Sequence, residues 1–451
     1  MTPKQILLDV LNHKKVGVLP WVPFAGVHAG KLVGYNATEV LTNKDKLVKS
    51  LLEVNKLYKP NGQPIIFDLQ LEAEILGCEL FFSDNYPPAV KSHPLENVET
   101  IPCECNLPTA TDGRLPVVLS AMKEMKEKVG NTTALYGLIC GPFTLALHLR
   151  GTNIFMDMNN EEYIKSLLEY CLKVSERMSD LFIEAGMDII AVVDPLVSQI
   201  SPANFEKFLD IPFSNLFKHI KANGAYSSFF VCGDATKNIE VMCKTKPNSI
   251  SVDENIDLVE AKKITDKYNI ILSGNIPLTS TMLHGTQEDN MKYVIDLIDR
   301  IGDTSNLIIA PGCDMPYDTP IENAIAITQA VTQPEIARKI LENYKAVTTD
   351  IYNKVPDYTS LEKPLIEVCT LDSTSCAACT YMMATVNQAK EDYGDTIDVI
   401  EHKFTLKENI ARFKKMGVTN LPSIYINGEL AFSSIIPSIN ELHQAIDKAF
   451  N

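Results

Sequence analysis

The chain has 451 residues, which is too long for one compact hydrophobic core and indicates two domains. Its 45% hydrophobic and 22% charged residues are those of an ordinary globular protein, which excludes extensive disorder. A formal net charge of −16 excludes nonspecific binding to nucleic acid and to an anionic membrane surface. No stretch of the sequence reaches the ~18 apolar residues that a membrane-spanning helix requires.

The cysteine content and the first residues indicate a reducing compartment. Eleven cysteines, an odd number spread over a long chain, are not typical of a secreted disulfide framework. Residues 1–15 predict a polar amphipathic helix without the apolar core of a signal peptide. We therefore expect a cytoplasmic protein.

Short β-rich runs alternate with longer amphipathic stretches between about residues 17 and 345. Strands separated by helices over this length predict an α/β fold, a (β/α)8 TIM barrel over residues 1–345. An open doubly wound sheet is disfavoured because no Gly-x-Gly-x-x-Gly follows the first strand. The expected strands are residues 18–24, 65–69, 134–140, 188–193, 227–232, 249–252, 270–273 and 307–310.

A second unit follows the barrel. Residues 346–363 lose apolar periodicity and predict a linker, so residues 364–451 form a separate small α/β domain. Its expected elements, in order, are a strand at 365–368, a helix opened by Cys376-Ala-Ala-Cys379, a strand at 397–400, a helix at 407–415, a strand at 424–426 after Leu421-Pro422-Ser423, and a last helix from Ile439.

Polar and glycine residues follow the expected barrel strands. The carboxyl ends of barrel strands share one face, and that face carries the active site in barrel enzymes. His28, in the loop after the first strand, could reach the same mouth. Asp194, followed by Pro195, suits substrate or cofactor contact better than core packing. The residues at the strand ends are Asp68, Gly141, Asp194, Cys232, Asp253, Glu254, Asn275 and Cys313.

Cys232 and Cys313 are the most informative of these residues. Each lies where a strand ends and a loop begins, in two separate strand-loop units. Soft thiolates brought together from such positions suit zinc, which in turn can activate a thiol. The alternative is that both are buried structural cysteines. Their expected place at the barrel mouth favours a functional role. Cys103 and Cys105, in a proline-flanked loop, read as an incidental pair.

The barrel resembles the uroporphyrinogen decarboxylase superfamily, and within it the corrinoid-dependent methyltransferase branch. The resemblance spans about residues 1–345 and rests on short segments that occur in order. These are Leu-Asn-His-Lys-Lys near the start, Glu72-Ala-Glu-Ile-Leu-Gly77, Cys140-Gly-Pro-Phe-Thr144, Glu184-Ala-Gly-Met-Asp188, Phe230-Val-Cys-Gly-Asp234, Ser273-Gly-Asn-Ile276 and Ala310-Pro-Gly-Cys-Asp314.

The resemblance implies one of two reactions. The decarboxylases bind tetrapyrrole carboxylates through arginines in an N-terminal glycine-rich segment, but the matching Phe24-Ala-Gly-Val-His-Ala-Gly30 has none. Porphyrinogen decarboxylation is therefore disfavoured, although Asp68 matches the decarboxylases' catalytic aspartate. The methyltransferase branch implies methyl transfer between a corrinoid and a thiol, or from another methyl donor to a corrinoid protein. Asn275, Gly141 and His28 are the cofactor-binding residues expected at its mouth.

The methyltransferase branch holds zinc with a His-x-Cys pair and a second, distant cysteine. This chain keeps Cys232 and Cys313 but has Phe230 in the histidine position. A catalytic zinc ion takes three protein ligands, so Glu254, or Asp253 beside it, is the expected third ligand. The substrate thiol or a cysteine of the second domain could complete the set instead. A further alternative is that no zinc binds and the cysteines act as a thiol pair.

The C-terminal unit resembles a thioredoxin-like fold that lacks its first strand and helix. The resemblance rests on Cys376-Ala-Ala-Cys379 at a helix start and on Leu421-Pro422-Ser423, and it implies a cis peptide bond before Pro422. The helix N-terminus stabilises a thiolate, so Cys376 is expected to be the exposed nucleophile and Cys379 the resolving thiol.

We therefore expect a methyltransferase whose partners are a corrinoid protein or free cobamide and a small thiol or methylated small molecule. A second hypothesis is a thiol-redox protein in which Cys376 and Cys379 act on Cys232 and Cys313. No nucleic acid or membrane partner is expected, and the sequence leaves a homodimer open.

Overall fold

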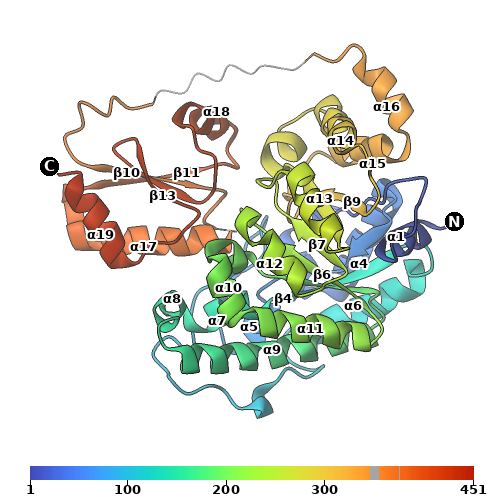
Figure 1. Cartoon of the computed structure of the whole chain (residues 1–451), viewed down its shortest axis with the longest axis horizontal. Helices are drawn as coiled ribbons and strands as arrows, with labels where there is room; N and C mark the ends of the chain where they lie inside the picture. Colours follow the sequence, from blue (N-terminus) through green and yellow to red (C-terminus); the bar gives the residue numbers. More distant parts are fainter. Residues whose placement is uncertain (346–354, 375, 451) are drawn as a thin grey trace. The chain divides into compact units, whose positions relative to one another are not determined.

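A computed structural model describes residues 1–345, 355–374 and 376–450. The chain forms two compact units, which meet in sequence between Tyr344 and Lys345 (Figure 1). None of the helices in the described ranges is long and apolar enough to cross a membrane.

The first unit is built on seven parallel strands. Each strand pairs with the next one along the sheet, in the order β1-β4-β5-β6-β7-β8-β9. The strands are β1 (Gly62–Pro64), β4 (Ala134–Cys140), β5 (Ile189–Val193), β6 (Tyr226–Val231), β7 (Ser249–Val252), β8 (Ile271–Ile276) and β9 (Leu307–Pro311). A separate two-stranded hairpin is formed by β2 (Leu80–Phe81) and β3 (Ala89–Val90).

The segment around Trp21 closes the sheet into a barrel. Trp21 forms a parallel bridge with Ile309 of β9, and Asn61, next to β1, donates its backbone N–H to Trp21 O (2.9 Å). The eighth strand, expected over residues 18–24, is therefore reduced to one bridge. Pro20 and Pro23 explain this difference, since a proline has no N–H to donate to a ladder.

The other predicted barrel strands agree with the structure except for the one expected over residues 65–69. That strand ends at Pro64, and Ile65 donates to Tyr136 O (3.2 Å) before the chain turns. The turn is held by Asp68, whose carboxylate accepts from Gln70 N (2.9 Å). The predicted fold class, a (β/α)8 barrel, is confirmed.

Helices of the first unit surround the sheet (Figure 1). Several begin at a side chain that accepts from the first turn, such as Asn160 before α9 and Thr286, which forms a capping box with Asp289, before α14. The helices are α1 (Pro3–Leu11), α2 (His28–Lys31), α3 (Ala37–Thr42), α4 (Lys44–Tyr58), α5 (Leu71–Ile75), α6 (Leu115–Val129), α7 (Pro142–Arg150), α8 (Asn153–Asp157), α9 (Glu161–Glu184), α10 (Pro202–Phe208), α11 (Asp210–Ala222), α12 (Ile239–Lys244), α13 (Leu258–Lys267), α14 (Gln287–Ile301), α15 (Ile321–Thr332) and α16 (Pro334–Leu341).

The second unit is a four-stranded mixed sheet with helices. Strand β10 (Leu365–Thr370) pairs in parallel with β11 (Asp398–Lys403) and antiparallel with β12 (Ser423–Ile426), which pairs with β13 (Glu429–Ser433). Its helices are α17 (Ala377–Tyr393), α18 (Lys407–Met416) and α19 (Ile439–Lys448). The peptide bond before Pro422 is cis, as predicted. Of the linker predicted over residues 346–363, residues 346–354 lie outside the described residues.

Candidate active site at the barrel mouth

Three aromatic rings fill the barrel below the carboxyl ends of its strands. Phe230 of β6 lies 4.8 Å from Phe24 and 5.7 Å from Phe67, measured between ring centroids. All three side chains are buried, and Cys232 and Cys313 pack against the same cluster. The two cysteines at the mouth therefore rest on an apolar floor that excludes water.

Cys232 and Cys313 are joined as a disulfide, with their Cα atoms 5.9 Å apart. They are 81 residues apart in sequence and follow β6 and β9, so the closure of the barrel brings them together. Their loops are packed closely: a Cβ atom at Gly312 would lie 2.7 Å from the backbone nitrogen of Glu254. The prediction that these two cysteines converge at the mouth agrees with this geometry.

The residues around the pair do not supply a third zinc ligand. The Glu254 carboxylate accepts from Leu278 N, and Asp253 accepts from Gly233 N (2.8 Å) and Asn255 N (3.0 Å). Phe230 has no donor atom. Throughout the described ranges, no three His, Cys, Asp or Glu side chains are grouped so that they could hold a metal. The expected set of Cys232, Cys313 and Glu254 therefore does not fit a catalytic zinc ion, which takes three protein ligands.

Asp68 forms a buried ion pair that the sequence did not predict. Arg114 Nη1 donates to Asp68 Oδ2 (2.5 Å), and Arg114 Nε donates to Glu74 Oε2 (2.7 Å). The Asp68 side chain is fully buried and Arg114 nearly so. Asp68 is thus charge-paired within the protein. Arg114 opens α6, 46 residues further along the chain, and no sequence pattern links the two residues.

Glu72 is a second residue that the sequence did not identify as functional. It lies in α5, and its Oε1 accepts from the backbone N–H of Cys140 (2.9 Å) at the end of β4. Its Oε2 is buried and has no hydrogen-bond partner among the described residues. Burial, reinforced by the nearby negative charge of Asp68, raises the pKa of Glu72 to about 8. The only signal in the sequence was its place in the segment Glu72-Ala-Glu-Ile-Leu-Gly77.

Asp194 and Gly141 hold the start of α7. Asp194 Oδ2 accepts from Phe143 N (2.9 Å), and Oδ1 accepts from Thr144 N (3.1 Å) and Thr144 Oγ1 (2.6 Å). A Cβ atom at Gly141 would lie 2.7 Å from Asp194 Cγ, so only glycine fits there. Burial raises the pKa of Asp194 to about 7 despite these bonds. Both Asp194 oxygens are used inside the protein, where we had expected a contact with substrate or cofactor.

His28 and Asn275 are also engaged within the protein. His28 Nδ1 lies 3.0 Å from Tyr317 O and Nε2 lies 2.7 Å from Tyr58 Oη, and burial lowers the pKa of His28 to about 4. The Asn275 amide donates to Asp253 O (2.8 Å) and to Ile256 O (2.7 Å). In this structure, both residues position the loops at the mouth rather than presenting free atoms to a cofactor.

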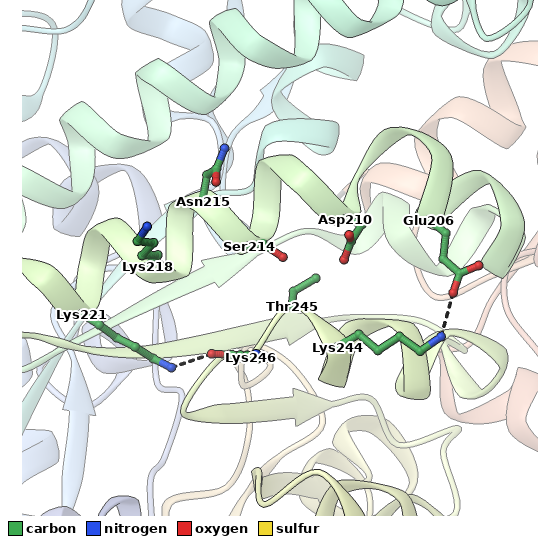
Figure 2. Close-up of a pocket in the computed structure, with 9 residues that line it drawn as sticks. All are labelled: Glu206, Asp210, Ser214, Asn215, Lys218, Lys221, Lys244, Thr245 and Lys246. Carbon is green, nitrogen blue, oxygen red and sulfur yellow. Dashed lines mark hydrogen bonds and ion pairs between the residues drawn. The ribbon is translucent and has the colours of Figure 1, made fainter.

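A groove lies on the outer surface of the first unit (Figure 2). It has a volume of about 680 Å³ and lies beside α11 and α12. Two of its lysines are engaged by other lining residues: Lys244 Nζ lies 2.8 Å from Glu206 Oε1, and Lys221 Nζ donates to the backbone oxygen of Lys246 (2.5 Å). None of the predicted site residues lines this groove.

The second unit presents two cysteines at the start of α17. Cys376 is the N-cap, and its Sγ accepts from the backbone N–H of Cys379 (3.4 Å). Cys376 is partly exposed whereas Cys379 is fully buried, and burial raises the pKa of the Cys379 thiol well above its usual value. The prediction that Cys376 is the more exposed thiol is confirmed. Neither cysteine is in a disulfide in this structure.

Comparison with known proteins identifies the family of the barrel. The family model of uroporphyrinogen decarboxylase (URO-D) matches residues 2–334. The chain belongs to the URO-D family. A thioredoxin-domain model matches residues 365–447 of this URO-D family chain.

Relatives of this URO-D family chain include two kinds of enzyme. It is 28% identical over 331 residues to the methylcobamide:CoM methyltransferase MtbA of Methanosarcina acetivorans, covering 71% of this chain and 95% of the relative. It is 27% identical over 347 residues to MtaA of Methanosarcina barkeri, also named a methylcobamide:CoM methyltransferase, covering 73% and 97%. It is 26% identical over 302 residues to the uroporphyrinogen decarboxylase of a Wolbachia of Brugia malayi, covering 65% and 83%.

A solved structure shares the fold of the barrel. A methyltransferase from Methanosarcina mazei superposes with a TM-score of 0.66 at 24% sequence identity, covering 76% of this chain and 99% of that chain. The architecture of the URO-D unit is therefore that of a known methyltransferase structure.

Proposed function

We propose that this URO-D family chain is a methyltransferase that moves a methyl group between a corrinoid and a small thiol. The observation that carries the proposal is the similarity to the methylcobamide:CoM methyltransferase MtbA, which extends over 95% of that relative. The corrinoid, free or protein-bound, and the thiol would be its two partners. The odd number of cysteines, eleven spread over the whole chain, favours work in a reducing cytoplasm.

Two features of the mouth argue against porphyrinogen decarboxylation. The glycine-rich segment from Phe24 to Gly30 contains no arginine to bind the carboxylates of a tetrapyrrole. Asp68, in the position of the decarboxylases' catalytic aspartate, is held by Arg114 in a buried ion pair. A carboxylate that is already paired in this way is less available to interact with a substrate cation.

The floor of the mouth supports methyl transfer by excluding water. Phe24, Phe67 and Phe230 are each buried and pack ring against ring below the cysteine pair. A dry, apolar surface favours a reaction in which a carbon electrophile must meet sulfur rather than water. A corrinoid supplies that electrophilic methyl group, and the protein supplies the position of the acceptor.

Glu72 is suited to take the proton of the acceptor thiol. A free thiol has a pKa of about 8.5, and a general base works best when its own pKa is close to that of the group and to the working pH. Burial raises the pKa of Glu72 to about 8, and its Oε2 has no partner among the described residues. The hydrogen bond from Cys140 N to Oε1 fixes the carboxylate, so the proton would pass to Oε2.

No step of this proposal passes through zinc. Reduction of the disulfide would make two sulfur ligands available at Cys232 and Cys313, but the described residues add no third one. Activation of the thiol is therefore assigned to Glu72 rather than to a Lewis acid.

We also propose domain limits for the chain: a barrel over residues 1–345, a linker over 346–363 and a thioredoxin-like domain over 364–451.

A methyl-transfer assay tests the proposal. Purified, reduced protein is incubated with methylcobalamin and a panel of small thiols that includes 2-mercaptoethanesulfonate. We expect the visible spectrum to change as methylcobalamin is demethylated, with equimolar thioether detected by mass spectrometry. Heat-inactivated protein serves as control. Failure with every thiol, together with release of carbon dioxide from uroporphyrinogen, would replace this proposal with decarboxylation.

A further inference from the structure

Cys232 and Cys313 form a disulfide at the barrel mouth, and a reductant must break this bond before either cysteine can act as a thiol. In a disulfide, neither Cys232 nor Cys313 is a thiolate, so the pair is neither a nucleophile nor a metal ligand. Both residues are only partly buried, which leaves the bond open to attack from the mouth. Any thiol chemistry of this pair therefore needs two electrons from a donor that can reach it.

The C-terminal unit carries a dithiol with the properties of such a donor. Cys376 is partly exposed at the N-terminus of the 17-residue helix α17, and its Sγ accepts from the backbone N–H of Cys379. Cys379 lies in the first turn of the same helix and is buried behind it. Its raised pKa keeps its thiol protonated until a disulfide forms beside it.

Seven other cysteines of the described residues are free. Five of them are buried, and burial raises the pKa of each: Cys78, Cys140, Cys171, Cys243 and Cys369. Cys103 and Cys105 are exposed, and the hydrogen bond from Cys105 lowers the pKa of Cys103, but they lie on a 3-10 turn of three residues rather than at the start of a long helix. They offer a matched control.

We propose that Cys376 and Cys379 reduce the Cys232–Cys313 disulfide of the same chain by thiol–disulfide exchange. This exchange reaction is separate from methyl transfer, because it involves only the sulfur atoms of the four cysteines. The proposal does not depend on which group the barrel transfers.

The exchange balances without a further reagent. The Cys376 thiolate attacks one sulfur of the barrel disulfide, so a Cys376–barrel bond forms and the other barrel cysteine leaves as a thiolate, which takes up a proton. Cys379 then gives up its proton and attacks Cys376, releasing the second barrel thiolate. Two electrons have moved to Cys232 and Cys313, and the C-terminal unit holds the new disulfide.

The covalent connection favours reaction within one chain. Tyr344 and Leu365 are joined by 21 peptide bonds, which allows a separation of at most about 70 Å. Two groups tethered in this way meet at an effective concentration in the millimolar range, far above the concentration of a second protein molecule in solution. The rate of exchange should therefore not depend on protein concentration.

Trapping of the mixed disulfide is the first test. In full-length Cys379→Ser, exchange stops after the first step, and we expect a disulfide-linked peptide pair that joins Cys376 to Cys232 or Cys313. Mass spectrometry of an unreduced, alkylated digest detects it. The yield should stay constant over about 100-fold dilution. A linkage that disappears on dilution, or that joins two differently isotope-labelled chains, would overturn reaction within one chain.

A second variant tests the proposal independently, in case Cys379→Ser does not fold. Cys376→Ser changes a partly exposed residue, and with limiting dithiothreitol its barrel disulfide should be reduced about tenfold more slowly than in the wild-type chain. The double variant Cys103→Ser/Cys105→Ser should match the wild type. Equal rates in the wild type and in Cys376→Ser would overturn the proposal. Both tests follow the disulfide bonds themselves, so their outcomes are independent of methyl transfer.

Discussion

Replacement of Glu72 by glutamine tests the general base, because it is expected to make the protein more stable and less active. The carboxylate is 1% exposed, and burial raises its pKa from 4.5 to about 8. Glutamine has nearly the same shape, and its Oε1 can still accept from Cys140 N. It carries no charge at any pH. The substitution therefore removes the ionisation of Glu72 and places the amide nitrogen of glutamine where Oε2 lies.

The magnitude follows from the pKa difference between the folded and unfolded chain. Because the folded pKa lies above the unfolded one, the protonated carboxyl contributes stability that is complete below pH 4.5 and is lost as the pH rises through about 8. A difference of about 3.5 pKa units at ~1.36 kcal/mol each corresponds to about 5 kcal/mol. Glu72→Gln should thus match the wild type near pH 4.5 and exceed its unfolding free energy by up to about 5 kcal/mol at pH 9.

Urea unfolding at several pH values measures this difference, with Glu79→Gln as a control. Glu79 is exposed and close in sequence, so its variant should stay within about 0.5 kcal/mol of the wild type at every pH. In the methyl-transfer assay, Glu72→Gln should lose about 100-fold in kcat and lose the rise in rate through about pH 8. The assignment of Glu72 is refuted if both the rate profile and the pH dependence of stability match those of Glu79→Gln.

Three further substitutions address the mouth and its support. Phe230→His places a nitrogen donor beside the cysteine pair, and elemental analysis of the reduced protein should show the zinc content rising to about one per chain. An unchanged zinc content would mean that the absence of a histidine at this position is not what prevents zinc binding. Gly141→Ala places a Cβ atom 2.7 Å from Asp194 Cγ and should lower the unfolding free energy by about 3 kcal/mol in urea; a loss below about 0.5 kcal/mol would contradict the close packing. Arg114→Met leaves buried Asp68 without its cation and should lower the unfolding free energy in urea at pH 7 by about 3–5 kcal/mol. A loss below about 0.5 kcal/mol would contradict the buried ion pair.

Much of the barrel could be predicted because strands and helices have local signatures. The apolar runs that became β4, β6 and β9 are continuous and short, as expected for strands buried on both faces, and amphipathic stretches separate them. The same local reading places Cys232 and Cys313 at strand ends, and the geometry of a parallel barrel brings such ends to one face. The convergence of the two cysteines therefore followed from the order of elements alone.

The partners of individual side chains could not be predicted in this way. Asp68 pairs with Arg114 across 46 residues, and Glu72 accepts from Cys140 across 68. The Glu254 carboxylate, assigned as a zinc ligand from the sequence, accepts from Leu278 N across 24 residues. Propensity and periodicity describe neighbours within a few positions, whereas these contacts form only after the sheet has closed and its loops have packed. The sequence by itself accordingly specifies the barrel and the residues at its mouth. The packing of the closed barrel determines which carboxylates are paired and which one remains without a partner. It also determines whether the two cysteines bind a metal or form a disulfide with each other.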